Sequence, residues 1–233
     1  MKNIAIITAR GGSKRIPRKN VKDFLGKPII CYAIEAALSS ALFEEVMVST
    51  DDEEIAQIAR TAGAKVPFMR SEKTAGDFAT TDDVLLEVLQ KYGEMGRQFD
   101  YMACLYPTAV FVTADLLKKA MEKLQKEQAS GLMPVVPFSF PPQRGMIAVN
   151  GRLQYQFPEC AAMRSQDLET VYHDCGQFYI YDVKKYLEKN AHVEEDYVPF
   201  PMKETEMQDI DNETDWALAE MKYQLLQEKK MER

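Results

Sequence analysis

A short basic segment near the amino terminus has the residue types that bind phosphate. Its centre is Arg10-Gly11-Gly12-Ser13-Lys14, and it continues to Lys19 and Asn20. Glycine carries no Cβ, so the backbone can turn sharply and approach a ligand closely, while lysine and arginine donate charge-assisted hydrogen bonds to phosphate oxygens. The apolar residues 4–9 before it are typical of a strand buried on both faces of a parallel sheet. A strand that leads into such a loop predicts a phosphate site, whereas a merely solvated loop would not need the two glycines.

The loop differs from two familiar glycine-rich phosphate loops. A P-loop has the order GxxxxGK[ST], but here the lysine follows Gly-Gly-Ser directly and no other glycine cluster precedes it. The dinucleotide fingerprint GxGxxG is also absent. The sequence therefore disfavours both a P-loop kinase and a dinucleotide-dependent oxidoreductase.

Two aspartates near the carboxyl terminus form a second candidate site. If residues 208–211 are extended, Asp209 and Asp211 project to one face while Ile210 points into the core. Two carboxylates that converge near a triphosphate fit Mg²⁺, which usually takes one or two carboxylates together with phosphate oxygens and water. The alternative is that both aspartates cap the following helix, a task for which Asn212 and Asp215 are also suited.

Further acidic residues follow the predicted strand 46–50. Residues 51–54 are Asp-Asp-Glu-Glu, and acidic side chains in a first turn complement the helix dipole. The segment is therefore interpreted first as the start of a helix. Recognition of a base or ribose, mainly by Ser49 and Asp51, is the alternative.

The segment from Ala9 to Asn20 resembles, without a gap, the A-R-G-G-S-K-x-I-P-x-K-N motif of the cytidylyltransferases that activate acidic nine-carbon sugars. Asp209-Ile210-Asp211 coincides with the D-I-D motif of that family. The resemblance implies a Rossmann-like α/β fold with a mostly parallel sheet, of the nucleotide-diphospho-sugar transferase type. It also implies that the basic loop wraps the triphosphate of CTP and that Mg²⁺ binds to the two aspartates.

The resemblance also names the residues expected in the site. An arginine and a Ser/Thr-containing loop contribute to nucleotide binding in that family, although a mobile surface loop is the alternative for residues 71–82. The residues expected to bind CTP are Ala9, Arg10, Gly11, Gly12, Ser13, Lys14, Lys19, Asn20, Arg70, Thr80 and Thr81. Those expected to take part in catalysis are Arg10, Lys14, Lys19, Asp209 and Asp211.

Two segments in the second half point to the sugar. Residues 164–168 and 172–179 resemble the R-S-Q-D-L and Y-H-D-A-G-Q-F-Y segments of the pseudaminic acid branch of the family, with Met163 and Cys175 as small departures. Arg164 is suited to bidentate pairing with a sugar carboxylate. A lone histidine such as His173 is more often structural than catalytic. The residues expected to bind the sugar are Tyr106, Arg164, Gln166, His173, Asp174 and Gln177.

Composition limits the class of protein. The chain has 233 residues, of which 46% are hydrophobic and 28% charged, and its net charge is −7. These values suit a single α/β domain, and the acidic balance argues against a nucleic-acid partner. No apolar run approaches the ~20 residues of a membrane span, and no signal peptide is evident. The scattered cysteines Cys31, Cys104, Cys160 and Cys175 indicate reduced thiols in a cytoplasmic protein.

The order of predicted elements agrees with that class. Helices are expected at 27–39, from about 51, at 82–92, at 113–128 and after Trp216. Strands are expected at 46–50, 65–70, 100–105, 131–136 and 177–181, with a hairpin at 146–153 that turns at Asn150-Gly151. Residues 1–233 are expected to form one nucleotidyltransferase domain with a small β-rich insertion at 138–175. The resemblance implies a homodimer in which this insertion covers an active site or reaches the other subunit.

The expected activity follows from the resemblance. The anomeric hydroxyl of a nonulosonic acid, expected to be pseudaminic acid, attacks the α-phosphate of CTP, and pyrophosphate leaves. N-acetylneuraminic acid, legionaminic acid and Kdo are alternative substrates for the same chemistry. A non-catalytic nucleotide-binding module is an alternative of a different class.

Overall fold

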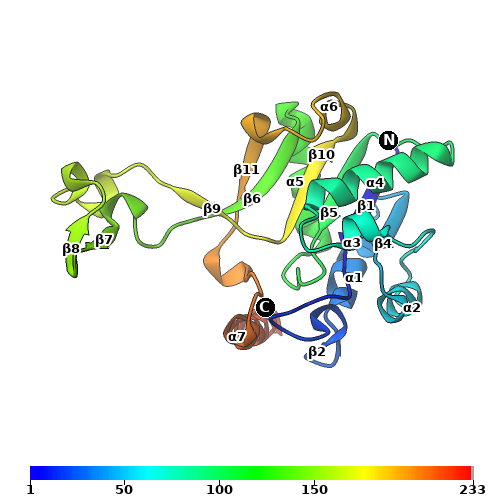
Figure 1. Ribbon diagram of the computed structural model, residues 1–233, viewed down its shortest axis with the longest axis horizontal. Coiled ribbons are helices and arrows are strands. Elements are labelled where there is room, and N and C mark those ends of the chain that lie inside the picture. Colours follow the sequence, from blue (N-terminus) through cyan, green and yellow to red (C-terminus); the bar gives the residue numbers. More distant parts are fainter. Residues whose placement is uncertain (232–233) are drawn as a thin grey trace.

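A mixed sheet with seven strands forms the centre of the fold (Figure 1). The computed structural model describes residues 1–231, and side chains are described for residues 1–229. Its strand order is β11-β6-β10-β5-β1-β4, and β9 pairs with the end of β6. Strand β1 is parallel to both β4 and β5, whereas β10 is antiparallel to β5 and β6. The strands are β1 (Asn3–Thr8), β4 (Glu45–Ser49), β5 (Tyr101–Leu105), β6 (Gly131–Pro137), β9 (Tyr172–Asp174), β10 (Phe178–Asp182) and β11 (Tyr197–Pro201).

Successive residues of the central strands face opposite sides of the sheet, as a pleated strand requires. In β1, Ala5 and Ile7 pack into a core with α1 (Ile30–Ser40), α2 (Glu53–Thr61) and α5 (Ala114–Glu127). Ile4 and Ile6 pack into a second core with α4 (Thr81–Glu94) and α6 (Val183–Glu188). The continuous apolar run in the sequence is therefore explained by helices on both faces.

A third apolar cluster joins the two ends of the chain. The last helix, α7 (Glu213–Met231), packs its Trp216 against Phe24 of a small hairpin formed by β2 (Asp23–Phe24) and β3 (Lys27–Pro28), with ring centroids 5.5 Å apart. The prediction that residues 27–28 open the first helix was wrong, because they pair with β2 and the helix begins at Ile30.

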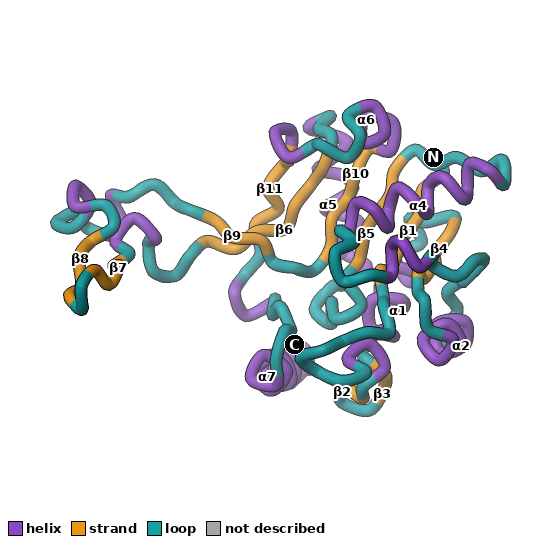
Figure 2. Tube along the Cα trace, viewed as in Figure 1, coloured by secondary structure: helices purple, strands orange, loops and turns teal. Residues whose placement is uncertain are grey.

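Residues 138–171 form an arm that projects from the sheet (Figures 1 and 2). Its tip is the hairpin of β7 (Met146–Val149) and β8 (Arg152–Tyr155). Asn150 and Gly151 have φ values of 51° and 74°, so the predicted Asn-Gly turn is confirmed as a turn of the primed type. Strand β9 pairs with β6, so residues 172–174 belong to the central sheet rather than to the projecting segment.

Most of the predicted elements are confirmed within a few residues at their ends, but the predicted strand 65–70 is wrong. Only Lys65 pairs with the sheet, where its N–H donates to the Val46 carbonyl and its own carbonyl accepts from Val48. Pro67 has no N–H to continue a ladder. Among the described residues, every helix is too short or too polar to span a bilayer.

Trp216 provides the first test of this architecture, because its indole is only 4% exposed and joins α7 to the amino-terminal hairpin. We expect Trp216→Ala to lower the free energy of unfolding by about 3–5 kcal/mol, since truncation of a buried aromatic leaves a cavity. Urea unfolding followed by circular dichroism measures the change. Leu218→Ala is the matched control on the same helix, since Leu218 is largely exposed, and it should cost about 0.5 kcal/mol or less. Equal losses in the two variants would contradict the assigned role of Trp216.

Candidate active site

A cleft of about 590 Å³ opens at the carboxyl ends of β1 and β5, which is where open α/β sheets bind ligands. Thr8 ends β1, and Tyr106, Pro107 and Thr108 follow β5. The basic loop and the segment between α3 (Glu72–Ala75) and α4 form its other walls. The turn at Tyr106 therefore borders the same cleft as the basic loop.

The basic loop is held by hydrogen bonds to its own backbone. The Asn20 side chain donates to the Arg10 carbonyl at 2.9 Å, and the Gly11 N–H donates to Asp51 Oδ1 at 2.9 Å. A Cβ at Gly11 would lie 2.8 Å from Asp52 Oδ2, so this position needs glycine for close packing, whereas a Cβ at Gly12 would meet open space. Asp51 thus holds the loop backbone in place.

Asp52, against which Gly11 packs, is the N-cap of α2. Asp52 accepts from the Ile55 N–H and pairs with the Arg18 guanidinium. These hydrogen bonds, that of Arg18 first, lower the pKa of the Asp52 carboxyl to about 2. The predicted start of a helix in residues 51–54 is confirmed, and the ionised cap fixes the position of Gly11.

Arg70 reaches the cleft from a half-buried position. Its guanidinium donates to Ser49 Oγ at 3.1 Å and to the Ser49 carbonyl at 2.7 Å. Burial lowers the pKa of Arg70, although nearby Asp51 and Glu87 act in the opposite direction. Ser49 therefore holds Arg70 in place from the end of β4.

The other cations of the cleft are paired with aspartates. Arg10 and Lys14 both contact Asp77, at 3.1 and 2.5 Å. Arg15 donates to Asp211 Oδ1 at 2.8 Å.

Lys19 lies between the basic loop and the two aspartates. Its Nζ donates to the Ile210 carbonyl at 2.6 Å and lies 3.8 Å from Asp211 Oδ1. Burial lowers the pKa of Lys19, while Asp211 and Asp209 act to raise it. This lysine thus supports the segment that carries the aspartates, in addition to its predicted role toward phosphate.

The Asp-Ile-Asp segment has the extended form that shared ligation requires. Ile210 is fully buried, whereas Asp209 and Asp211 both line the cleft. Asn212 Oδ1 accepts from Thr214 and Asp215 N–H groups, and Asp215 accepts from the Asp211 N–H, so the cap of α7 is supplied by Asn212 and Asp215. The carboxylates of Asp209 and Asp211 therefore do not cap α7 and instead face the cleft.

These two carboxylates fit a hard cation bound jointly with phosphate. Burial raises the pKa of the Asp209 carboxyl, and the charge of Asp211 adds to this shift. Such a crowded pair of carboxylates is stabilised by a nearby positive charge. No group of three or more acidic, histidine or cysteine side chains within the described part of the chain is arranged to hold a metal by itself. Asp209 and Asp211 would therefore hold Mg²⁺ together with phosphate oxygens and water.

Most of the residues predicted for CTP and catalysis meet in this cleft. Those that line it are Arg10, Ser13, Lys14, Lys19, Asn20, Arg70, Thr80, Thr81, Asp209 and Asp211. Ala9, Gly11 and Gly12 are not among its lining residues and form the backbone at the base of the loop. Thr80 caps α4 through a capping box with Asp83.

Of the residues predicted for the sugar, Tyr106 alone lines the cleft within this chain's described residues. Arg164 and Gln166 lie on the arm, where Arg164 pairs with Asp167 at 2.7 Å. His173 Nδ1 lies 2.9 Å from the Asp174 carbonyl, and Asp174 accepts from Tyr179 at 2.5 Å.

Gln177 is fully buried and donates to the Gln208 carbonyl at 2.9 Å. It therefore supports the residue before Asp209.

Two charged residues that line the cleft, Arg15 and Asp77, were not predicted from the sequence. Arg15 occupies a variable position of the basic motif, so the motif made no prediction for it. Asp77 lies in the polar segment 71–82, where attention fell on hydroxyl side chains. Both become visible through their ion pairs, which join residues far apart in the sequence.

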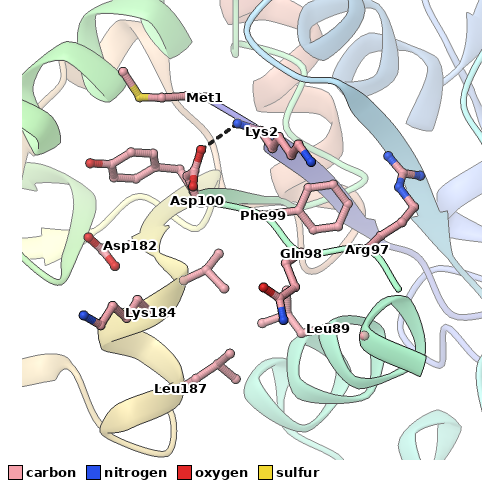
Figure 3. A pocket seen from close by; sticks show the side chains of 13 residues that line it. Met1, Lys2, Leu89, Arg97, Gln98, Phe99, Asp100, Asp182, Lys184 and Leu187 are labelled. Atoms are coloured by element: carbon pink, nitrogen blue, oxygen red, sulfur yellow. Dashed lines mark hydrogen bonds between the residues drawn. The ribbon is translucent and has the colours of Figure 1, made fainter. Parts of the chain in front are cut away.

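A larger cavity, of about 1120 Å³, lies at the amino ends of β1 and β5, on the opposite edge of the sheet. Figure 3 shows Met1, Lys2, Phe99 and Asp100 in its lining, with the Lys2 N–H donating to Asp100 Oδ2 at 2.7 Å. None of the residues predicted for catalysis or binding lines it. The smaller cleft is therefore the better candidate for the active site.

Comparison with known proteins agrees with this geometry. The cytidylyltransferase family model matches residues 4–224. Pseudaminic acid cytidylyltransferase of Campylobacter jejuni is 40% identical over 226 residues, which cover 97% of this chain and 97% of that protein. CMP-N,N'-diacetyllegionaminic acid synthase of Legionella pneumophila is 34% identical over 235 residues, which cover 98% of this chain and 99% of that protein.

A solved structure shows the same fold. CMP-2-keto-3-deoxy-manno-octonic acid synthetase complexed with CTP aligns with a TM-score of 0.68 at 21% identity and covers 98% of this chain and 100% of that chain. The expected α/β fold of the nucleotide-diphospho-sugar transferase type is confirmed.

A cationic glycine loop that faces two aspartates at the carboxyl edge of an α/β sheet defines a nucleotidyltransferase. The family match is more specific, and the chain belongs to the cytidylyltransferase family. The predicted resemblance and the predicted enzyme class are thereby confirmed.

Gly176 offers a test of how Asp209 is positioned. Its φ is +60°, and a Cβ there would lie 3.0 Å from Asp209 Cγ, so the carboxylate would have to shift by a few tenths of an ångström. We expect Gly176→Ala to lower the rate of pyrophosphate release from CTP by on the order of 10- to 100-fold, because small displacements at a reacting centre are costly.

Gly96→Ala is the matched control for Gly176→Ala. Gly96 has a φ of +74° with nothing near its Cβ position, so it suffers the same backbone strain without a clash. This control should lose about 1–2 kcal/mol of stability and keep its turnover. Similar rates in the two variants would contradict the close packing of Gly176 on Asp209 as the feature that matters.

Proposed function

We propose that the protein transfers CMP from CTP to pseudaminic acid and releases pyrophosphate. The observation that carries this proposal is the meeting of the basic loop and the Asp-Ile-Asp segment, 191 residues apart at the Lys19–Ile210 contact, around one cleft. The relative from Campylobacter jejuni supports pseudaminic acid as the sugar, since it is 40% identical over nearly the whole chain.

In the proposed reaction the anomeric hydroxyl oxygen forms a bond to the α-phosphorus, and the bond from that phosphorus to the β-phosphate breaks. Arg10 and Lys14 offset the charge that develops on the leaving pyrophosphate, and Ser13 donates a hydroxyl hydrogen bond to it. Mg²⁺, when held by Asp209 and Asp211, would orient the phosphates and favour ionisation of the attacking hydroxyl. Lys19 fixes the position of the two aspartates through the Ile210 carbonyl.

The nucleotide is proposed to lie against the wall formed by Arg70, Thr80 and Thr81. Tyr106 also lines the cleft, with its hydroxyl 3.4 Å from Thr81 Oγ1, and is proposed to contact the sugar beside this wall. Burial raises the pKa of Tyr106, so its hydroxyl stays protonated as a hydrogen-bond donor near neutral pH.

We further propose a homodimer in which the arm serves the partner. The arm exposes a row of large apolar side chains: Phe138, Phe140, Met146, Ile147, Val149, Leu153, Phe157, Met163 and Val171. Apolar surface on this scale is typical of a protein contact. Arg164 and Gln166 lie on this arm and would reach the sugar site of the other subunit, where Arg164 is suited to the sugar carboxylate. The cytoplasmic location expected from the scattered cysteines stays a prediction.

The proposed substrate is tested by pyrophosphate release from CTP and Mg²⁺ with pseudaminic acid, N-acetylneuraminic acid, legionaminic acid and Kdo in parallel. We expect release with pseudaminic acid at a rate at least about tenfold above the others, because pockets that hydrogen-bond a substrate discriminate strongly. Faster release with legionaminic acid, as the Legionella relative would suggest, replaces the sugar and keeps the reaction. Absence of release with every sugar contradicts the proposed function and favours a nucleotide-binding module.

The role of the arm is tested by mixing two inactive variants. Arg164→Ala loses the arginine proposed for the sugar carboxylate, and Asp211→Ala loses a proposed metal ligand. If the arm acts in the partner's site, each mixed dimer has one intact site. An equimolar mixture after subunit exchange should then recover about a quarter of the wild-type rate in a two-fold dimer.

Each variant alone, treated in the same way, is the control for the mixing experiment. Light scattering gives the oligomeric state of every sample. A dimeric mixture without recovery would show that Arg164 acts within its own subunit or not at all, and a monomeric protein would contradict the dimer.

A further inference from the structure

A carboxylate of the protein occupies the place where the cleft would receive an anion. Asp77 Oδ1 accepts from Arg10 at 3.1 Å, and Asp77 Oδ2 accepts from Lys14 at 2.5 Å. These are the two basic side chains proposed above to bind the leaving pyrophosphate. The positive charge of these two side chains is therefore partly offset by an acidic residue of the same chain, which a phosphate ligand would have to displace.

We propose that Asp77 is an internal competitor for the phosphate site and sets its preference for ligands that carry a pyrophosphate group. This inference rests on the proposed CTP site, since Arg10 and Lys14 must be the residues that the phosphates displace from Asp77.

The ion pairs of Asp77 are of a kind that a phosphate can replace. The side chains of Arg10, Lys14 and Asp77 are 40%, 75% and 48% exposed, and exposed ion pairs contribute little to stability because water screens them. A triphosphate or pyrophosphate offers several charged oxygens to the same two cations. The phosphate of CMP carries fewer charges and would lie nearer the nucleoside, so it has less ability to displace Asp77.

The loop that carries Asp77 is fixed at its ends and free at its tip. On one side Thr74 is buried and bonded to Glu87, and on the other side Thr80 forms the capping box of α4. Between them Phe78 is fully exposed and packs on nothing. Displacement of Asp77 therefore breaks its ion pairs without the loss of buried apolar surface, and the ends of the loop keep Thr80 and Thr81 in position.

The competition also has a consequence after the reaction. Once pyrophosphate leaves, Arg10 and Lys14 regain Asp77 as their partner. The CMP-sugar, which has a single phosphate, then meets Arg10 and Lys14 while both are paired with Asp77. Asp77 thus disfavours retention of the product relative to CTP.

Asp77→Asn tests the proposal, with binding measured by calorimetry for sodium pyrophosphate, CTP and CMP in buffer without metal. We expect the variant to bind pyrophosphate and CTP about 3- to 10-fold more tightly, because the competing charge is gone while the amide keeps the shape of the side chain. Binding of CMP should change by less than about twofold. Circular dichroism should show an unchanged melting curve, since the Asp77 side chain is about half exposed.

Glu72→Gln is the matched control. It removes one negative charge from the first turn of α3, near Asp77 in the chain, and Glu72 has no ion pair within the described residues. Its affinities should stay within about twofold of wild type, because Asp77 and not Glu72 makes the ion pairs with Arg10 and Lys14, and an unpaired surface charge is screened by salt. An equal gain of affinity in Glu72→Gln would assign the effect to net charge and overturn the proposal.

Unchanged or weaker binding of pyrophosphate by Asp77→Asn would also overturn it, since the carboxylate would then be neutral or helpful toward the ligand. A wild-type protein that binds pyrophosphate but not CTP would contradict the proposed function instead. Because pyrophosphate is measured by itself, the two failures can be told apart.

Discussion

The burial of Ile210 is the constraint on which the candidate site depends. Ile210 is fully buried with Ile16, Phe24 and Trp216, and this cluster attaches the last helix to the segment that follows the basic loop. Because Ile210 points inward, its two neighbours must point outward into the cleft. Apolar packing between the two ends of the chain therefore positions the two carboxylates beside the basic loop.

Four cations of the cleft are paired with acidic side chains of the chain itself. Arg10 and Lys14 share Asp77, whereas Arg15 and Lys19 approach Asp211. Each of these two sets of ion pairs corresponds to one component of the proposed reaction. Phosphates would replace Asp77 beside Arg10 and Lys14, and a metal cation would compete with Arg15 and Lys19 for Asp211. These ion pairs offset part of the charge that gathers around the cleft.

The arm differs from the charged cleft, because it exposes many apolar side chains. Its strands β7 and β8 form a two-stranded hairpin that lies away from the central sheet (Figure 1), and the arm exposes apolar side chains on the way to its tip. An isolated hairpin of this kind has little stability in water. Its composition is explained if a second subunit covers it, which is also the arrangement that would bring Arg164 to a sugar site.

The sequence by itself determined the fold class, the basic loop and the acidic pair, because these features are local. Apolar runs and helical periodicity predict β1, β5, α4 and α5, and Asn150-Gly151 predicts the hairpin. Only the tertiary structure decided which polar residues meet. The pairing of Lys27–Pro28 with β2, the isolated bridge at Lys65, and the contacts of Asp77 with Arg10 and of Arg15 with Asp211 depend on segments that are remote in the sequence. Local patterns carry no information about such contacts, because burial and charge pairing between remote segments arise only when the chain has folded around a common core.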